Sequence, residues 1–217
     1  MAEKISWETY RKEAMNNLKI MSRTANGIVS TASAKGKEED MLVASGLEAR
    51  ELANRNYERA LRRAYEERDR KFSSPEEVRD FITELVQIIN DGIAKPECFF
   101  RTREISWYLP AAELPAYFSW FCGQLYERFD AEQANPWETA CFIELQIDAV
   151  AHFFADGCGK TSRLLSSYAL MRAGEHLPRY RDREEYYTVC NSSPYPRRDT
   201  RYYQGFWAYY QTLIPVS

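Results

Sequence analysis

A short stretch in the second half of the chain contains residue types that together can handle phosphates. It reads His-Phe-Phe-Ala-Asp-Gly-Cys-Gly-Lys-Thr-Ser-Arg over residues 152–163. Two glycines separated by one residue permit backbone conformations that other residues rarely adopt. Because they lead into a helical pattern, they would stand at a helix N-terminus, where unpaired N–H groups and the helix dipole attract anions. The stretch therefore predicts a phosphate-binding loop between two helices.

The charged side chains of this stretch fit the same chemistry. Lys160 adds a positive charge at the helix start, and Arg163 follows one turn later on roughly the same helix face. Asp156 offers a hard oxygen ligand for the Mg²⁺ that a bound triphosphate needs. His152, at the end of the preceding helix, is a candidate general base. A lone histidine is more often structural, but its spacing to Asp156 and the glycines favours a chemical role.

A Walker A loop is a different phosphate-binding motif, and the sequence does not fit it. That motif needs Gly-x-x-x-x-Gly-Lys-Ser/Thr directly after a strand. Residues 159–161 match its end, but Phe154 stands where the first glycine should be, and the preceding segment has a helical pattern. The P-loop interpretation is therefore rejected.

The composition is that of a globular protein. The chain has 217 residues, 45% of them apolar and 28% charged, and a formal net charge of −3. These values predict one domain, or one domain with an extension, whose core needs neither metals nor disulfides. We expect no nucleic-acid partner, since the whole chain has no basic signature and acids follow the basic run at 59–63.

The cysteines and the apolar runs indicate the compartment. No CxxC pair occurs, and the number of cysteines is odd, which argues against a zinc site or a disulfide framework. The N-terminus lacks the apolar run of a signal peptide, and no window reaches the length of a membrane span. We therefore expect a cytoplasmic protein, or an exported effector, with no membrane partner. The cysteines are Cys98, Cys122, Cys141, Cys158 and Cys190.

The elements that must position the loop are predicted to be mainly helices. Ser74 can cap a helix that begins at Pro75, and Gly174 is a plausible stop for the helix after the loop. Residues 6–33 have a mixed, weakly helical pattern, and residues 99–109 alone have strand character, so we expect a short flap or hairpin there. Apolar periodicity predicts helices at about 41–70, 73–90, 114–128, 137–153, 160–173, 181–190 and 200–213.

The stretch resembles the signature of the Fic family, His-x-Phe-x-(Asp/Glu)-Gly-Asn-Gly-(Arg/Lys)-x-x-Arg. The resemblance extends over about residues 73–213, for example at 88–93, 100–102 and 164–178. It implies a mainly α, Fic-like helical bundle with a short β-hairpin flap in residues 73–217, preceded by a helical extension at 1–72. The matching signature positions are His152, Phe154, Asp156, Gly157, Gly159, Lys160 and Arg163.

The resemblance also implies an activity: a protein adenylyltransferase that moves AMP from Mg·ATP to a Tyr, Ser or Thr hydroxyl of a target protein, or of the chain itself. His152 would deprotonate the hydroxyl, Asp156 would hold Mg²⁺, and Arg163 would reach the γ-phosphate. The α- and β-phosphates would lie in an anion hole made by Gly157, Cys158, Gly159 and Lys160. An extended stretch of the target would pair with a docking flap that contains Thr102, Glu104, Ile105, Ser106 and Trp107.

Two departures from the signature keep other functions open. Cys158 replaces the usual Asn, whose side chain can hydrogen-bond a phosphate better than a thiol can. Lys160 keeps the charge of the more common Arg but loses its bidentate fork. The alternatives are a Fic-fold enzyme that transfers another phosphate-containing group, and a degenerate nucleotide-binding module without turnover. A structural helical protein with an accidental motif is a further alternative.

An inhibitory helix is the last expectation from the resemblance. Many family members carry Ser/Thr-x-x-x-Glu-Gly/Asn, in which the Glu pairs with the final motif Arg. The nearest match here is Ala-Ser-Gly-Leu-Glu-Ala at 44–49, where Ser45 is one position off and Ala49 replaces the small polar end. Glu48 is therefore predicted to be the inhibitory residue. The alternative is that Glu48 is one of many exposed acids on a charged helix.

Overall fold

The computed structural model describes residues 5–21, 46–95, 97–105, 108–130, 134–192 and 200–215. Within these ranges the chain is mainly α, as predicted, with eight α-helices and no named β-strand. A 3₁₀ turn at Ala111–Glu113 and a π-helix at Leu145–Ala151 complete the elements. The α-helices are α1 (Trp7–Met21), α2 (Gly46–Glu66), α3 (Pro75–Asn90), α4 (Leu114–Asp130), α5 (Pro136–Glu144), α6 (Cys158–Ala173), α7 (Arg183–Asn191) and α8 (Thr200–Gln211).

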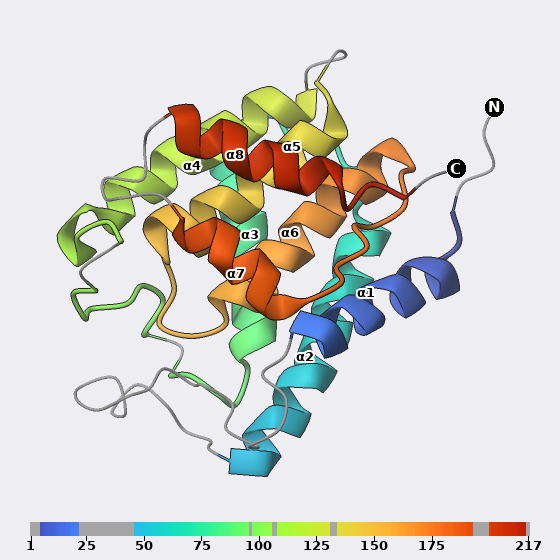
Figure 1. Ribbon diagram of the computed structural model, residues 1–217. Helices are drawn as coiled ribbons and strands as arrows, with labels where there is room; N and C mark the ends of the chain where they lie inside the picture. Colours follow the sequence, from blue (N-terminus) through green and yellow to red (C-terminus); the bar gives the residue numbers. More distant parts are fainter. Residues whose placement is uncertain are drawn as a thin grey trace.

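Helix α6 lies at the centre of the bundle. It packs against α5, α2 and α3, while α7 and α8 cross in front of it in Figure 1. Most of its residues are buried, and these include Ser162, Arg163, Ser166 and Ser167. Buried polar groups need partners, so the helix that carries the predicted phosphate loop must also carry a polar network into the core.

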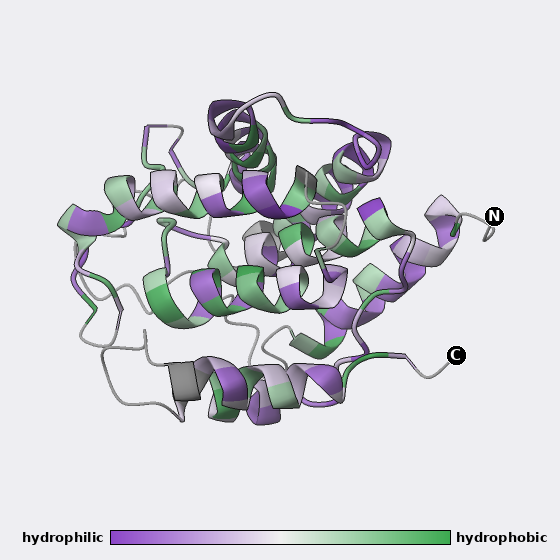
Figure 2. Ribbon diagram, turned by 90° about the horizontal axis from the view of Figure 1, so that it is seen from above, coloured by the Kyte–Doolittle hydropathy of each residue, from purple (hydrophilic) through white to green (hydrophobic). Residues whose placement is uncertain are grey.

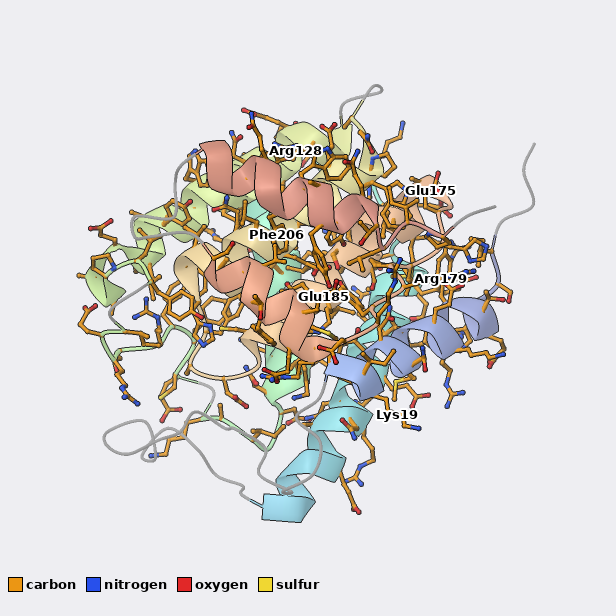
Figure 3. All side chains as sticks on the ribbon, viewed as in Figure 1. Lys19, Arg128, Glu175, Arg179, Glu185 and Phe206 are labelled. Atoms are coloured by element: carbon orange, nitrogen blue, oxygen red, sulfur yellow. The ribbon has the colours of Figure 1, made fainter. Side chains whose placement is uncertain are left out.

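The other helices bury one face each. Figure 2 shows hydrophilic and hydrophobic residues alternating along most of them, as expected for helices on the surface of a core. In Figure 3, Phe206 lies between α7 and α8, whereas Lys19 and Glu175 lie on the outside. The apolar core is continuous from Tyr10 in α1 to Tyr210 in α8, so residues before position 73 share one core with those after it.

Local sequence signals explain where several helices begin and end. Ser74 accepts a hydrogen bond from the backbone N–H of Glu77, and Pro75 occupies the first turn of α3. The Asp182 carboxylate accepts one from the N–H of Glu185 at 2.8 Å and caps α7. Gly174 ends α6 with φ +76°, a left-handed conformation that favours glycine. The predictions for Ser74, Pro75 and Gly174 are confirmed.

Two elements differ from the sequence-based expectation. Residues 7–21 form helix α1, although their pattern is mixed, because packing in the core supplies what intrinsic propensity lacks. The helix predicted over about 137–153 is α-helical only to Glu144 and then widens into the π-helix. Hydrophobic periodicity alone does not distinguish these two kinds of helical turn.

The predicted hairpin flap has no strand in its described residues. An antiparallel bridge joins Phe100 to Phe154. It connects the flap segment to the loop after His152 and does not pair two parts of the flap with each other. Ser106 and Trp107 lie outside the described residues. The hairpin therefore stays a prediction.

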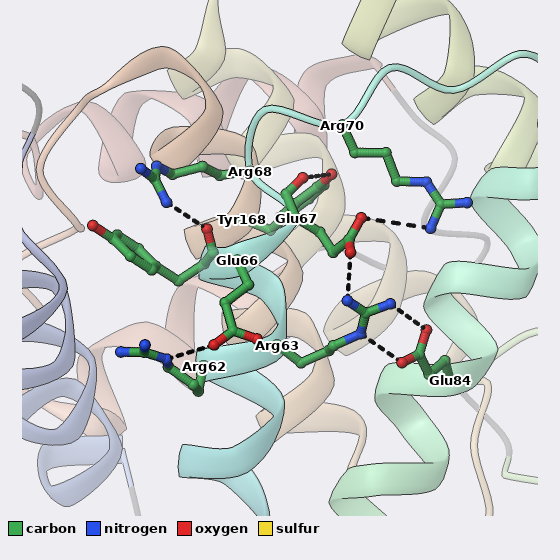
Figure 4. Close-up of polar contacts among 9 residues, drawn as sticks. Arg62, Arg63, Glu66, Glu67, Arg68, Arg70, Glu84 and Tyr168 are labelled. Atoms are coloured by element: carbon green, nitrogen blue, oxygen red, sulfur yellow. Dashed lines mark hydrogen bonds and ion pairs between the residues drawn. The ribbon is translucent and has the colours of Figure 1, made fainter.

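A charged seam runs along α2 where it meets α3 and the loop after α2. Arg63 donates to Glu84 at 2.7 Å and also contacts Glu67, while Arg62 donates to Glu66 at 2.8 Å (Figure 4). The Arg62 and Glu66 side chains are each half exposed, so this part of the basic run is a solvated face. Among the described helices, none has the length and apolar content needed to cross a membrane.

Candidate active site

The π-helix ends at His152, which is partly buried. The N–H of His152 donates to the carbonyl of Ile147 at 3.0 Å, which closes the last wide turn. His152 itself has φ +47°, a left-handed conformation that costs a non-glycine residue about 1–2 kcal/mol. Single π-helical turns are frequent at functional sites. The strained geometry fixes where the imidazole leaves the helix.

The surroundings of the His152 ring keep it neutral. Tyr108 stacks on it, with ring centroids 4.8 Å apart and an interplanar angle of 26°. Burial lowers the pKa of His152 to about 4; the Asp148 carboxylate opposes this shift and the Arg101 guanidinium adds to it. At neutral pH the imidazole therefore has a free nitrogen lone pair, which a general base needs.

The loop after His152 is anchored by the base of the flap. The N–H of Arg101 donates to the Phe153 carbonyl at 3.0 Å, and the N–H of Ala155 donates to the Phe99 carbonyl at 3.1 Å. The Phe154 ring is buried against the rings of Phe99 and Phe118. Backbone pairing on one side and aromatic packing on the other hold the loop in one place.

Arg101 is a structural centre of the site that sequence reasoning missed. Its buried guanidinium donates to the carbonyls of His152 at 2.9 Å, Ala151 at 3.2 Å and Arg103 at 2.6 Å, and also to that of Leu109. A single arginine thus joins both ends of the flap to the end of the π-helix. An arginine between an aromatic and a threonine gives no sequence signal for this role.

Gly157 caps the start of α6 at a point with little room for a side chain. Its φ is +75°, and a Cβ there would lie 3.0 Å from Asn90 Oδ1 and 3.0 Å from Ile89 Cγ2. Asn90 also donates to the carbonyl of Asp156 at 3.3 Å, so the end of α3 supports the loop. The helix follows at once, since the N–H of Thr161 donates to the Gly157 carbonyl at 2.8 Å. The glycine pattern thus produces the helix N-terminus that the sequence predicts.

The side chain of Cys158 points into the core. Its Sγ accepts a hydrogen bond from the N–H of Phe154 at 3.2 Å and donates to the carbonyl of the same residue at 3.4 Å. Burial raises the pKa of this thiol above its usual range. Only the backbone of Cys158 is therefore free to meet an anion, and its thiol holds the loop closed.

Asp156 and Lys160 are both partly buried, at either side of the start of α6, and each charge affects the pKa of the other group. Burial raises the pKa of Asp156, and the positive charge of Lys160 opposes that shift. Burial likewise lowers the pKa of Lys160, and the Asp156 carboxylate opposes that shift. The described residues contain no group of three or more side chains that could hold a metal ion. A single carboxylate does suit Mg²⁺, which takes one or two carboxylates plus substrate phosphates.

Arg163 lies across the first turn of α6 and is paired with a buried acid. Its Nη1 lies 3.2 Å from Oδ2 of Asp148, and both side chains are less than a tenth exposed. Its Nη2 lies against Gly159, where it occupies the space that a Cβ would take. Sequence reasoning missed Asp148, although the run 142–150 is apolar except at Glu144, Gln146 and Asp148. Two acids one turn apart in such a run are a signal for buried carboxylates.

The remaining predicted residues lie around this centre or outside the described part. Thr102 and Glu104 are exposed, and the Glu104 carboxylate accepts a hydrogen bond from the N–H of Ala111 at 2.9 Å. Ile105 is partly buried. The backbone of Glu48 belongs to the first turn of α2, and its side chain is outside the described residues. The predicted base, metal ligand, anion loop and arginine thus meet at the junction of the π-helix and α6.

Among the comparisons with known proteins, the one with solved structures identifies the fold. No protein-family model and no curated protein sequence matches the chain. A Fic domain containing signaling protein from Bacteroides thetaiotaomicron has a similar structure, with a TM-score of 0.63 and 16% identity over 94% of this chain and 81% of that one. Fic-1 from C. elegans, residues 134–508, has a TM-score of 0.54 and 20% identity over 95% of this chain and 62% of that one. The chain therefore has the Fic fold.

Proposed function

We propose that the chain is a Fic-type protein adenylyltransferase, which transfers AMP from Mg·ATP to a hydroxyl of a target protein. One observation carries the proposal: the Arg163 guanidinium lies across the first turn of α6, at Gly159, directly after the loop that begins at His152. A base, a helix N-terminus and a fixed positive charge can together deprotonate a hydroxyl, bind phosphates and stabilise the charge that develops on them.

The reaction follows from the roles of these groups. The target hydroxyl oxygen attacks the α-phosphorus, its proton passes to the neutral imidazole of His152, and the bond to the bridging oxygen breaks so that pyrophosphate leaves. The N–H groups at the start of α6 and the charge of Lys160 stabilise the negative charge on the phosphates. Asp156 would hold Mg²⁺, which when bound neutralises phosphate charge.

The proposed target is a protein with an accessible Tyr, Ser or Thr, and the chain itself is a second candidate. Thr102 and Glu104 are exposed, and the bridge from Phe100 to Phe154 brings this segment beside the loop, which suits pairing with an extended target segment. We infer a cytoplasmic site of action, or one reached after export. A Fic-fold transfer of a different phosphate-containing group is the alternative, and a panel of nucleotides distinguishes the two.

Histidine substitutions test the proposal. Labelled ATP is incubated with candidate protein targets and with the unvaried chain, His152→Ala or His176→Ala. His176 is the only other histidine of the chain, is exposed, and contacts Glu13 rather than the loop. Loss of the base should reduce label transfer about a hundredfold or more, and His176→Ala should leave it unchanged. Equal transfer by the unvaried chain and His152→Ala, or no transfer by any of them, would contradict the proposal.

The position of Cys158 favours one second candidate, a nucleotide-binding module without turnover. Its thiol contacts the loop backbone at Phe154 instead of facing the anion. Cys158→Asn replaces the thiol with an amide, which can hydrogen-bond a phosphate when it turns toward the bound nucleotide. If the unvaried chain binds ATP without transfer and Cys158→Asn restores transfer, the second candidate is correct.

Inhibition by Glu48 is a separate proposal. If its carboxylate occupies the position of the γ-phosphate next to Arg163, then Glu48→Gly should raise ATP binding and label transfer. Glu51→Gly, at an exposed position three residues later in α2, is the matched control for the added glycine. Equal behaviour of the two variants would contradict the inhibitory role.

A further inference from the structure

One carboxylate beneath the first turn of α6 receives three hydrogen bonds from two neighbouring helices. Oδ2 of Asp148 accepts from Ser162 Oγ at 3.0 Å, from Arg163 Nη1 at 3.2 Å and from Tyr186 Oη at 3.1 Å. Asp148 belongs to the π-helix. Ser162 and Arg163 belong to α6, and Tyr186 belongs to α7. The proposed reaction assigns no role to Asp148, yet it connects all three elements behind the phosphate loop.

The guanidinium of Arg163 has two different edges in this arrangement. Nη1 faces the Asp148 carboxylate, and Nη2 lies against Gly159 at the start of α6. The Tyr187 hydroxyl lies 3.4 Å from the position that a Gly159 Cβ would take, so it borders the same space. Because a guanidinium is a rigid planar fork, fixing the Nη1 edge also fixes the direction of the Nη2 edge.

We propose that Asp148 is the positioning residue for Arg163, and that it aims the Nη2 edge at the terminal phosphate of the bound nucleotide. The inference rests on the proposed function, because it names the group that sets the preference for a triphosphate. Ser162 and Tyr186 hold the carboxylate still, so it can act as a fixed backstop rather than as a mobile counter-ion.

The opposite role makes an opposite prediction. If Asp148 were a competitor that withholds Arg163 from the nucleotide, its removal would release the arginine and tighten triphosphate binding. If it positions Arg163, its removal leaves the guanidinium without its partner, and triphosphate binding weakens. The sign of the change in affinity therefore decides between the two roles.

The test compares ATP with ADP, each with Mg²⁺, by calorimetry on the full chain. The variants are Asp148→Asn and, as a matched control, Glu144→Gln; Glu144 is a buried acid one turn earlier that accepts from the Tyr180 and Tyr210 hydroxyls. We expect Asp148→Asn to weaken ATP binding by about tenfold or more, the effect of losing one charge-assisted contact, and ADP binding much less. Glu144→Gln should leave the ratio of the affinity for ATP to the affinity for ADP unchanged.

A second variant covers the case in which Asp148→Asn does not fold. Tyr186→Phe removes one of the three donors to Asp148 and keeps the buried ring. It should therefore also lower the ratio of ATP affinity to ADP affinity, by a smaller factor than Asp148→Asn does. An unchanged ratio in both variants, or tighter ATP binding in either, overturns the inference.

An NMR measurement separates this inference from the proposed function. Nitrogen signals of the Arg163 guanidinium report how freely its edges exchange, with no nucleotide present. We expect restricted exchange in the unvaried chain and faster exchange in the Asp148 or Tyr186 variant; the same exchange in both overturns the inference. If the unvaried chain binds neither nucleotide, the proposed function fails, and the NMR result still decides whether Asp148 holds Arg163.

Discussion

Arginine–carboxylate pairs occur in two regions of this molecule, and their surroundings differ. Arg163 and Asp148 lie at 3.2 Å with side chains that are 7% and 3% exposed. Arg62 and Glu66, on the seam of α2, lie closer, at 2.8 Å, but each is 50% exposed. The shorter distance therefore belongs to the pair that water already solvates.

The difference shows that burial, rather than distance, decides what such a pair does. An exposed pair contributes about 0–1 kcal/mol, because solvent screens it and its long side chains lose entropy when they meet. Breaking a buried pair leaves a charge without solvent or partner and costs about 3–5 kcal/mol. A buried arginine whose pair is this costly to break keeps one orientation. A binding site needs such a fixed group, whereas an exposed surface pair does not.

The largest expected effect is on stability when the buried pair is broken. Asp148→Ala should lower the free energy of unfolding by about 3–5 kcal/mol, because Arg163 is left buried and unpaired. Urea unfolding followed by circular dichroism measures the change. A loss below about 1 kcal/mol would place this pair in the same class as the exposed ones.

Two glycines sharpen the contrast between the site and the rest of the molecule. Gly157 and Gly174 have nearly equal φ values of +75° and +76°, but a Cβ would meet Asn90 and Ile89 only at Gly157. Gly174→Ala should cost about 1–2 kcal/mol from backbone strain alone. Gly157→Ala should cost more, because the contacts at 3.0 Å add to the same strain. Equal losses of unfolding free energy would mean that the loop yields to the added methyl group.

The dependence of stability on pH gives a third comparison. The pKa of His152 is about 4 in the folded state, against about 6.5 when unfolded, because burial disfavours the charged ring. Between these values the unfolded state binds more protons, so the free energy of unfolding should fall as the pH is lowered through this window. Each pKa unit corresponds to about 1.4 kcal/mol before solvent screening.

His152→Gln is the control for that comparison, since it removes the titrating group and should flatten the stability profile between about pH 4 and 6.5. Label transfer by the unvaried chain should stay constant as the pH is lowered to about 5, because the imidazole remains neutral there. Transfer that instead falls around pH 6.5 would show that the ring titrates as it does in water.

The smallest expected effect belongs to the seam. Glu66→Gln removes the charge from an exposed pair and should change the unfolding free energy by no more than about 0.5 kcal/mol. Added salt should reduce even that difference, since it screens exposed charges. A loss above about 2 kcal/mol would show that exposed pairs in this protein do more than the comparison allows.

The parts of this fold that depend on local sequence could be predicted. The cap at Ser74, the stop at Gly174 and the helix start after Gly157 each follow from the conformational preference of one or two residues. The mainly α class and the order of the helices follow from apolar periodicity. The resemblance of residues 152–163 to the Fic signature led to the same fold that the structural comparisons found.

The parts that depend on tertiary contacts could not be predicted. The partners of Asp148, and the His152 and Ala151 carbonyls around Arg101, come from residues far apart in the chain. The π-helix before His152 is local, but apolar periodicity does not distinguish it from an α-helix. Cys158 is an example: the departure from the motif is visible in the sequence, but the contacts of its thiol with Phe154 are visible only in the structure. Sequence thus locates the chemical groups, whereas packing decides which way they face.

The central claim is that this site presents an α-phosphate to a hydroxyl beside His152, and the position of a radioactive label in ATP tests it most directly. The chain and its candidate targets are incubated with Mg²⁺ and with ATP labelled at either the α- or the γ-phosphate. We predict that protein acquires the α-label and not the γ-label, which leaves with pyrophosphate. Transfer of the γ-label, or of neither label under conditions where ATP binds, would contradict the account.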